Sequence, residues 1–502
     1  MDCCAPVRSS GLAVHKYYIG QVFCLAMSTN PNILFFFSDQ HRFDWLGSNP
    51  DIPVRTPNID RLSRLGVQFE NAICPAPLCA PSRACLASGM AFDRCGVPNN
   101  YTNYPVDGWP RPQPTYYERL RDEANYHVMG CGKLDLQKAT FNWGKDGKYL
   151  TSALGFSEAI NNADKSLAKH HVDDVIQSEQ QHDPYTEYLR EQELLDLHIK
   201  DFSDRSLDTN HPTPLPDEAY IDNWIARNGL DLLNSAPEGK PWHLVVNFAG
   251  PHSPFDPTEE MHSWYRGDNV TDFPGPIDTD DRFSSETHNE IRRNYAAMIE
   301  NLDRWIGVYL EKLEKRGELD DTIVVYSSDH GEMLGDHGRF HKGSPYQPSV
   351  GVPLIVSGPG VEQRGSVEEL ANLIDLHATF LDYAGISTDN GRTPARPSLG
   401  CAQRTENSST HIDTKSVRPY LEGETDMHRE YLYAGLDSCT LGSSSTMQLI
   451  FDGRYKLIEG WTPRDNTEPP VLFDHKIDPH ETCNVASENP DVVSHLRERI
   501  PE

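Results

Sequence analysis

The run NILFFFS at positions 32–38 has no charged residue and places five apolar residues in succession. A strand with one face in water alternates polar and apolar side chains, so a continuous apolar run of this length is typical of a strand buried on both faces of a parallel sheet. Further runs of strand length lie at 126–129, 242–248, 322–327 and 353–357. The chain therefore requires covering layers on both sides of a sheet.

Helical patterns lie between these runs and supply those layers. Residues 56–67 read TPNIDRLSRLGV, with Pro57 in the first turn and Gly66 as the stop signal, and residues 291–316 are strongly periodic. Alternating strands and helices predict an α/β fold with a mostly parallel sheet flanked by helices. Residues 165–240 are polar and acidic, and we expect them to form an excursion over the sheet edge rather than core.

The composition changes near residue 394, which predicts a second structural unit. Residues 394–416 are rich in Ser, Thr, Arg and Pro, as in a loop or linker. Beyond them, the segments 430–433, 447–451 and 455–458 resemble short strands, and 490–500 resembles a helix. We therefore predict a large domain over residues 31–393 and a smaller C-terminal α+β subdomain with an antiparallel sheet over 394–502.

The first 30 residues form a leader in this scheme. A short apolar run at 17–27 follows Arg8 and Lys16, but Gln21 interrupts it and no small-x-small cleavage site follows. A signal peptide, a disordered leader and a true start at Met27 all remain open, so it is also open whether residues 1–26 belong to the mature protein. The weak signal favours a cytoplasmic location over a periplasmic or secreted one. No run approaches the length of about 18 apolar residues that indicates a membrane span.

Charge and cysteine content exclude several classes of function. The 45 basic and 75 acidic residues give a net charge of −30, which repels nucleic acid and anionic membranes. Any site for an anion must therefore carry its own cations or a metal. Among 11 cysteines no CxxC pair occurs, so neither a zinc site nor a disulfide framework is predicted.

Polar side chains follow four of the predicted strands. In a doubly wound sheet the carboxyl ends of the strands meet at a ligand-binding edge. Each residue alone has a structural explanation, as a helix cap or as packing, but their convergence favours a site. Oxygen ligands with an imidazole suit Ca²⁺, Mg²⁺ or Mn²⁺, which would in turn hold a tetrahedral anion. The residues at these strand ends are Asp39, Gln40, Lys133, His252, Asp329 and His330.

The stretch LCAPSRACLASG at 78–89 places a thiol near the start of a predicted helix. Because residues 82–86 continue as a helix, Cys79 lies at or just before its N-terminus. Free N–H groups and the helix dipole there favour an anionic nucleophile and a bound oxyanion. Arg83, one turn further on, could neutralise that nucleophile or the ligands of a metal.

These residues resemble a known family. CAPSR at 79–83, continued by LASG at 86–89, is similar to the signature of type I sulfatases, in which a separate maturation enzyme oxidises this cysteine to formylglycine. SDQHRFDWLG, TPNIDRL, SSDHGEMLGDHGRFHKG and LFDHKIDPHETCNVA resemble further family segments, so the likeness covers about residues 31–492. The resemblance implies the fold of the alkaline phosphatase superfamily.

The resemblance also implies roles for individual residues. A divalent cation, expected to be Ca²⁺ with Mn²⁺ or Mg²⁺ as alternatives, would be bound by Asp39, Asp329, His330 and formylglycine 79, with Gln40 beside them. Arg83 would stabilise the aldehyde hydrate, while Lys133, His252 and Lys342 would hold the sulfate oxygens. Asp329 would act as a base, and His252 or Lys342 would protonate the leaving alcohol.

Three positions depart from the common family pattern. Ser38 stands where many sulfatases have aspartate, and His330 where many have asparagine, which is closer to the choline-sulfatase and phosphonate monoester hydrolase branch. Asp135 stands where the family often has histidine. It could contact substrate hydroxyl groups or stabilise Lys133, and both interpretations stay open.

We therefore expect an enzyme that hydrolyses a sulfate ester, with a sulfated saccharide preferred over a small aryl or choline ester. A phosphonate monoester or phosphodiester hydrolase with the same site is the first alternative. An anion- or glycan-binding protein in which Cys79 is never converted is the second. The expected partners are the sulfated substrate and the maturation enzyme; the oligomeric state is not predicted.

Four aromatic residues in the 140–240 region could stack on sugars, although packing is the favoured interpretation: Trp143, Tyr149, Tyr185 and Trp224.

Overall fold

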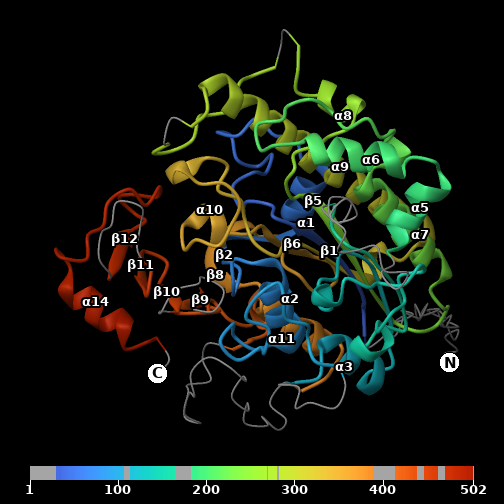
Figure 1. Ribbon diagram of the computed structural model, residues 1–502. Coiled ribbons are helices and arrows are strands. Elements are labelled where there is room, and N and C mark those ends of the chain that lie inside the picture. Colours follow the sequence, from blue (N-terminus) through green and yellow to red (C-terminus); the bar gives the residue numbers. More distant parts are fainter. Residues whose placement is uncertain are drawn as a thin grey trace, which may run out of the picture.

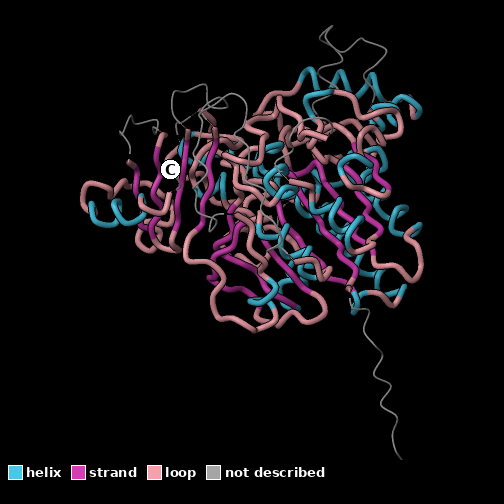
Figure 2. Tube along the Cα trace, turned by 90° about the horizontal axis from the view of Figure 1, so that it is seen from below, coloured by secondary structure: helices cyan, strands magenta, loops and turns pink. Residues whose placement is uncertain are grey.

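The computed structural model describes residues 30–106, 113–165, 183–267, 270–279, 282–387, 413–437, 446–461 and 470–500. The leader, apart from residue 30, and the boundary at 393–394 lie outside these ranges. The described chain forms an eight-stranded sheet, in the order β4-β3-β5-β1-β6-β7-β2-β8, and a four-stranded sheet, in the order β12-β11-β10-β9. Figures 1 and 2 show the small sheet lying to one side of the large one, with helices covering both faces of the large sheet.

The large sheet is mostly parallel, as predicted. Its strands are β1 (Asn32–Asp39), β2 (Gly66–Ile73), β3 (His127–Gly132), β4 (Glu158–Asn161), β5 (Trp242–Pro251), β6 (Thr322–Ser328), β7 (Leu354–Ser357) and β8 (Gly365–Asn372). β1 pairs in parallel with both β5 and β6. Only β7 runs antiparallel within the described sheet, against β2 and β6.

Helices cover the sheet on both faces. They are α1 (Pro57–Leu65), α2 (Cys79–Ser88), α3 (Tyr116–Glu123), α5 (Pro184–Glu191), α6 (Leu195–Asp204), α7 (Ile221–Ser235), α8 (Glu259–Ser263), α9 (Ser285–Arg316), α10 (Gln347–Val350), α11 (Asp375–Tyr383), α12 (Arg418–Leu421) and α14 (Pro490–Arg497). The predicted helix at 56–67 ends at Leu65, because Gly66 already begins β2.

The apolar run in β1 is explained by these two layers. Phe35 packs on one face against Phe380 of α11, with ring centroids 5.5 Å apart. Phe36 points to the other face and meets Tyr309 of α9 edge-on at 5.2 Å. Consecutive side chains of a strand point to opposite faces, so a strand covered on both sides is apolar at every position.

The expectation that residues 165–240 avoid the core is wrong for α7. Its residues Ile221, Ile225 and Leu233 are buried, and they belong to the same apolar cluster as Leu244 of β5. Asp222 of the same helix also faces the sheet, where its Oδ1 accepts the N–H groups of Ala249 and Gly250 of β5 at 2.7 and 3.0 Å. The polar composition of the segment thus concealed an amphipathic helix.

The C-terminal subdomain is an antiparallel sheet of β9 (Leu432–Leu436), β10 (Met447–Phe451), β11 (Tyr455–Glu459) and β12 (Val471–Asp474), accompanied by α14. The antiparallel sheet confirms the prediction, although β12 was not foreseen.

A buried ion cluster joins this sheet to the large domain. The carboxylate of Glu481 pairs with Lys456 and lies 2.8 Å from Nε2 of His475, and it accepts the backbone N–H of Gln347 at 2.6 Å. The Lys456 ammonium donates to the carbonyl oxygen of Pro345 at 3.0 Å.

This cluster predicts a specific dependence of stability on pH. Burial alone would raise the pKa of Glu481, but Lys456 and His475 lower it to about 2, below its ordinary value of 4.5. The folded state thus binds fewer protons than the unfolded state between these values, and the stabilisation is present above pH 4.5 and lost as the pH falls through 2. Glu481→Gln should flatten this part of the profile. It should also destabilise the protein at neutral pH by about 3–5 kcal/mol, because Lys456 stays buried without its partner.

Urea unfolding at a series of pH values measures both effects. Glu481→Gln/Lys456→Met is the matched control, since it removes both charges and should recover part of the lost stability at neutral pH. A wild-type slope in Glu481→Gln would contradict the assignment.

Candidate active site

Four of the predicted metal-binding residues lie together at the carboxyl ends of β1 and β6. Asp39 ends β1, Asp329 and His330 follow β6, and Cys79 is the first residue of α2. One side-chain donor atom from each lies within 4.8 Å of the others, and all four residues are buried. The sulfur of Cys79 is 3.2 Å from Nε2 of His330, which is 3.6 Å from Oδ1 of Asp329.

The donor atoms of this group fit a divalent cation. Oδ1 of Asp39 is buried without a hydrogen-bond partner, and a buried carboxylate oxygen left unpaired is costly unless a cation neutralises it. Two carboxylates and one imidazole form the mixed oxygen and nitrogen set that hard or intermediate divalent ions accept.

Gln40 lies beside this group but its side chain has other partners. Its backbone, at φ 72°, donates an N–H to Oδ1 of Asp329 at 3.1 Å. Its side-chain oxygen accepts from Nζ of Lys342 at 2.6 Å, and its amide nitrogen donates to Glu332. A direct role as metal ligand therefore stays a prediction.

The predicted lysine and arginine side chains surround these four candidate metal ligands. Nζ of Lys133, directly after β3, donates to Asp39 and lies 3.8 Å from the Cys79 sulfur. Nε of Arg83 donates to Oδ2 of Asp329 at 2.8 Å. Burial and Asp39 would raise the pKa of Cys79, but Lys133, followed by Lys342 and His330, lowers it to about 6, so residue 79 lies where a negative charge is stabilised.

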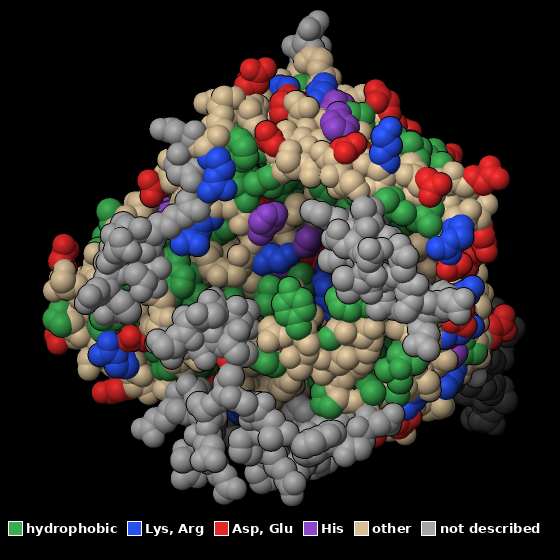
Figure 3. Space-filling view, in the orientation of Figure 1, with side chains coloured by type: hydrophobic (Ala, Val, Ile, Leu, Met, Phe, Trp, Pro, Cys, Tyr) green, Lys and Arg blue, Asp and Glu red, His purple; other side chains and the backbone are tan. Residues whose placement is uncertain are grey.

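His252 and Lys342 form a pair at the opening of the site. Nζ of Lys342 lies 2.6 Å from Nε2 of His252. Burial lowers the pKa of His252 well below its ordinary value, and the adjacent Lys342 lowers it further. The imidazole is therefore neutral and accepts a hydrogen bond from the ammonium. Figure 3 shows lysine or arginine and histidine side chains gathered in a hollow near the middle of this face.

The residues of the CAPSR segment hold α2 in this position. The backbone N–H of Ala80 donates to Oδ1 of Asn100 at 3.0 Å, which satisfies one free donor of the helix N-terminus. Oγ of Ser82 donates to the carbonyl oxygen of Asp329 at 2.6 Å and so ties the helix to β6. Gly89 ends the helix at φ 71°, where a Cβ atom would lie 2.8 Å from the ring of His377.

Comparison with known proteins decides the family. A family model described as Sulfatase matches residues 31–386. The chain belongs to the sulfatase family. The arylsulfatase of Clostridium perfringens is 28% identical over 71% of this chain and 75% of that protein. The choline-sulfatase of Rhizobium meliloti is 25% identical over 92% of this chain and 83% of that protein. Arylsulfatase K of Homo sapiens is 26% identical over 94% and 81% of the two chains.

Solved structures show the same fold. The phosphonate monoester hydrolase of Agrobacterium radiobacter superposes with a TM-score of 0.72 at 21% identity, covering 93% of this chain and 94% of that one. A protein solved in complex with its substrate D-glucosamine-2-N,6-O-disulfate gives a TM-score of 0.68 at 20% identity, covering 93% and 96%. These structures confirm the predicted fold. The family model and the curated relatives confirm the predicted class of sulfuric ester hydrolase.

In this sulfatase, the carboxylate of Asp135 contacts two lysine side chains. At φ 54°, its Oδ2 lies 3.5 Å from Nζ of Lys133 and 3.0 Å from Nζ of Lys138, which also bonds to Asp164 at 2.9 Å. Of the two open interpretations, these contacts favour stabilisation of Lys133. Lys138 and Asp164 were not foreseen, although the spacing of three residues between Asp135 and Lys138 was a visible signal.

A second unforeseen lysine supports the loop of His252. Lys165 is only 3% exposed, and its ammonium lies 2.6 Å from Oδ1 of Asp256. It also lies 3.1 Å from the Tyr220 hydroxyl and donates to the carbonyl oxygens of His252 and Pro254 at 3.3 and 3.5 Å. A buried lysine thus fixes the backbone on both sides of residue 253.

The aromatic residues of the 140–240 region mostly pack. Trp143, Tyr185 and Trp224 are buried, and the rings of Tyr185 and Trp224 lie 5.5 Å apart. Of these four, Tyr149, at 43% exposure, is the one with a ring open to a ligand. The packing interpretation is confirmed for the other three.

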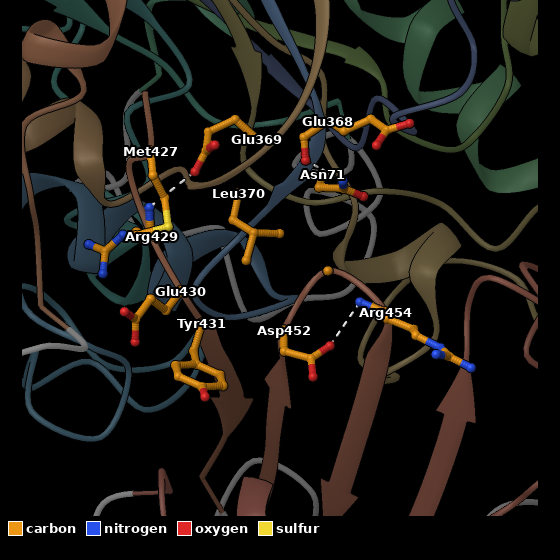
Figure 4. Close-up of a pocket in the computed structure, with 11 residues that line it drawn as sticks. Asn71, Glu368, Glu369, Leu370, Met427, Arg429, Glu430, Tyr431, Asp452 and Arg454 are labelled. Atoms are coloured by element: carbon orange, nitrogen blue, oxygen red, sulfur yellow. Dashed lines mark hydrogen bonds between the residues drawn. The ribbon is translucent and has the colours of Figure 1, made fainter. Parts of the chain in front are cut away.

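A separate cleft of about 500 Å³ lies between β8 and the C-terminal strands (Figure 4). Two of its acidic side chains already accept backbone hydrogen bonds: Glu369 accepts from the N–H of Arg429 at 3.3 Å, and Asp452 from that of Arg454 at 2.8 Å. None of the predicted site residues lines it. The cleft belongs to the junction between the two sheets.

The described cysteines carry free thiols: Cys74, Cys79, Cys85, Cys95, Cys131 and Cys483. Across the same parts of the chain, each helix is too short or too polar to cross a bilayer.

Proposed function

We propose that this sulfatase hydrolyses a sulfate ester of a carbohydrate, using formylglycine formed from Cys79 by a maturation enzyme. The divalent cation, proposed as Ca²⁺, would be held by Asp39, Asp329, His330 and residue 79. One observation carries the proposal: the donor atoms of these four residues lie within 4.8 Å of one another at the N-terminus of α2.

In the proposed reaction, residue 79 is a hydrated aldehyde whose two hydroxyl groups have separate tasks. One hydroxyl gives up its proton to Asp329 and attacks sulfur, and the bond from sulfur to the substrate oxygen breaks. The other then gives its proton to the His252–Lys342 pair, which has already lost one to the departing alcohol, as the bond from residue 79 to the sulfate oxygen breaks and the aldehyde re-forms. Addition of water restores the hydrated aldehyde. A bound cation lowers the pKa of the attacking hydroxyl and polarises the sulfuryl group.

The remaining residues bind and deliver protons. Lys133 and Arg83 are placed to offset the charge of the oxygens around residue 79, since both already contact its carboxylate neighbours. Lys342 and His252 hold a proton between Nζ and Nε2, 2.6 Å apart, and this proton would go to the departing alcohol.

The carbohydrate part of the proposal draws on structural neighbours. One is named as a complex with D-glucosamine-2-N,6-O-disulfate, and another is described in terms of glycosaminoglycan metabolism. The alternative activity on phosphonate monoesters draws on the fold shared with phosphonate monoester hydrolases. The relatives at 25–28% identity are sulfatases, which favours the sulfate ester.

Two measurements on protein from its native host test the proposal. Peptide mass spectrometry should find that CH₂–SH of residue 79 has become CHO, and an unconverted thiol would favour the binding-protein alternative. Turnover of p-nitrophenyl sulfate should exceed that of the matched methyl p-nitrophenyl phosphate diester. Faster cleavage of the diester would reverse the assignment.

A further inference from the structure

His341, directly before Lys342, has an unusual backbone conformation. Its φ of 67° lies in the left-handed region, which a non-glycine residue adopts at a cost and keeps only when its surroundings impose it. The carboxylate of Glu332 imposes it here: Oε1 accepts the backbone N–H of His341 at 2.5 Å and that of Leu334 at 3.0 Å. The carbonyl oxygen of His341 accepts from the N–H of Met333 at 2.9 Å. Hydrogen bonds between its two ends thus hold the segment 332–341 as a loop, which presents His341 in a fixed orientation.

The side chain of His341 is exposed and joins the two loops that form the opening of the site. Its Nδ1 lies 3.1 Å from Oγ of Ser253, the neighbour of His252. Across the described residues, Nε2 of His341 has no hydrogen-bond partner. The imidazole therefore keeps one polar atom available beside the Lys342–His252 pair.

The position of the Lys342–His252 pair determines which part of a substrate can contact His341. Lys342 and His252 are the groups proposed to protonate the departing oxygen. In the chain, His341 directly precedes Lys342, and Ser253 directly follows His252. His341 is exposed whereas Lys342 and His252 are partly buried, so substrate atoms beyond that oxygen can reach the His341–Ser253 contact on the solvent side of the pair. An imidazole and a hydroxyl both donate and accept hydrogen bonds, so they suit a polyhydroxylated group rather than an apolar ring.

We propose that His341 and Ser253 form a subsite for the leaving alcohol, in which Nε2 of His341 hydrogen-bonds to a hydroxyl group next to the esterified carbon of a saccharide. Glu332 is the positioning residue that holds His341 there. This inference rests on the proposed function and adds the element that selects a sugar over an aryl alcohol.

The test compares two kinds of substrate in three variants. p-Nitrophenyl sulfate has no hydroxyl beside its ester, whereas galactose 4-sulfate, glucose 3-sulfate and galactose 2-sulfate each carry a free hydroxyl on a carbon next to the esterified one. For the best of these sugars, His341→Ala should raise KM about tenfold with kcat nearly unchanged, because a hydrogen bond present in both the bound and transition states is lost. The kinetics on p-nitrophenyl sulfate should stay within about twofold. His341→Asn, which tolerates a positive φ and keeps hydrogen-bonding groups, should recover part of the loss.

His495→Ala is the matched control, because this exposed histidine of α14 contacts Tyr431 in the C-terminal subdomain, away from the site. It should leave both kinds of substrate unaffected. Equal losses on both in His341→Ala would overturn the subsite, and so would a wild-type enzyme that cleaves p-nitrophenyl sulfate but none of the sugars. Failure to cleave any sulfate ester would instead overturn the proposed function.

Discussion

Cys79→Ala should abolish hydrolysis while leaving the fold intact. The variant has no sulfur to oxidise, so residue 79 cannot become an aldehyde and the nucleophile is lost. Removing the nucleophile of a hydrolase typically lowers kcat by about 10⁴–10⁶-fold. The thermal midpoint should change little, because the side chain is small and its sulfur contacts His330 and Lys133 of the site rather than the apolar core. Initial rates on p-nitrophenyl sulfate with purified protein measure the loss.

Cys85→Ala provides the control for this experiment. Cys85 lies on the same helix, is equally buried and belongs to the apolar cluster behind the site. Its removal should cost about 1 kcal/mol of stability, as for one or two buried atoms, and little activity. If Cys79→Ala retained more than a small fraction of the wild-type rate, another group would have to be the nucleophile.

The sequence predicted those parts of the site that lie at strand ends. Asp39, Lys133, His252 and Asp329 follow apolar runs, and topology alone brings such positions to one edge of a sheet. Cys79 and Arg83 came from a local pattern at the start of a helix. Local patterns thus predicted the layered fold and the group of residues at the strand ends, whereas Lys342 came only from the resemblance to sulfatases.

The supporting residues could not be found in this way. Lys165 reaches Asp256 and the loop of His252 across 91 positions of sequence, and Glu332 reaches Gln40 across 292. Such pairings depend on how loops pack, and no periodicity marks them. The same reason applies to β7, whose sequence PLIVS reads as a strand but does not encode that it runs antiparallel to β6. α7 was missed for a different reason, because the polar side chains on its outer face made an amphipathic helix resemble an exposed segment.

Asp329→Asn should lower kcat/KM by about 10³-fold or more, because the substitution keeps the shape of the side chain and removes its charge. A metal ion contributes several kcal/mol of transition-state stabilisation, and each 1.4 kcal/mol is about tenfold in rate. Asp329 also accepts Nε of Arg83 at 2.8 Å and the N–H of Gln40 at 3.1 Å, so the neutral amide weakens the hold on both. The bound metal, measured by elemental analysis, should fall in parallel with activity.

Asp303→Asn separates this effect from the general loss of a buried carboxylate. Asp303 is also buried but lies away from the site, where Oδ1 accepts the N–H groups of Asn58 and Ile59 at 2.9 and 2.8 Å. Asparagine keeps an acceptor there, so this variant should lose some stability but neither metal nor activity. If Asp329→Asn instead kept its metal and lost activity only as far as it lost stability, the carboxylate would serve Arg83 and the fold rather than the cation. The combination of metal content, rate and unfolding free energy in the two variants therefore distinguishes a ligand from a structural partner.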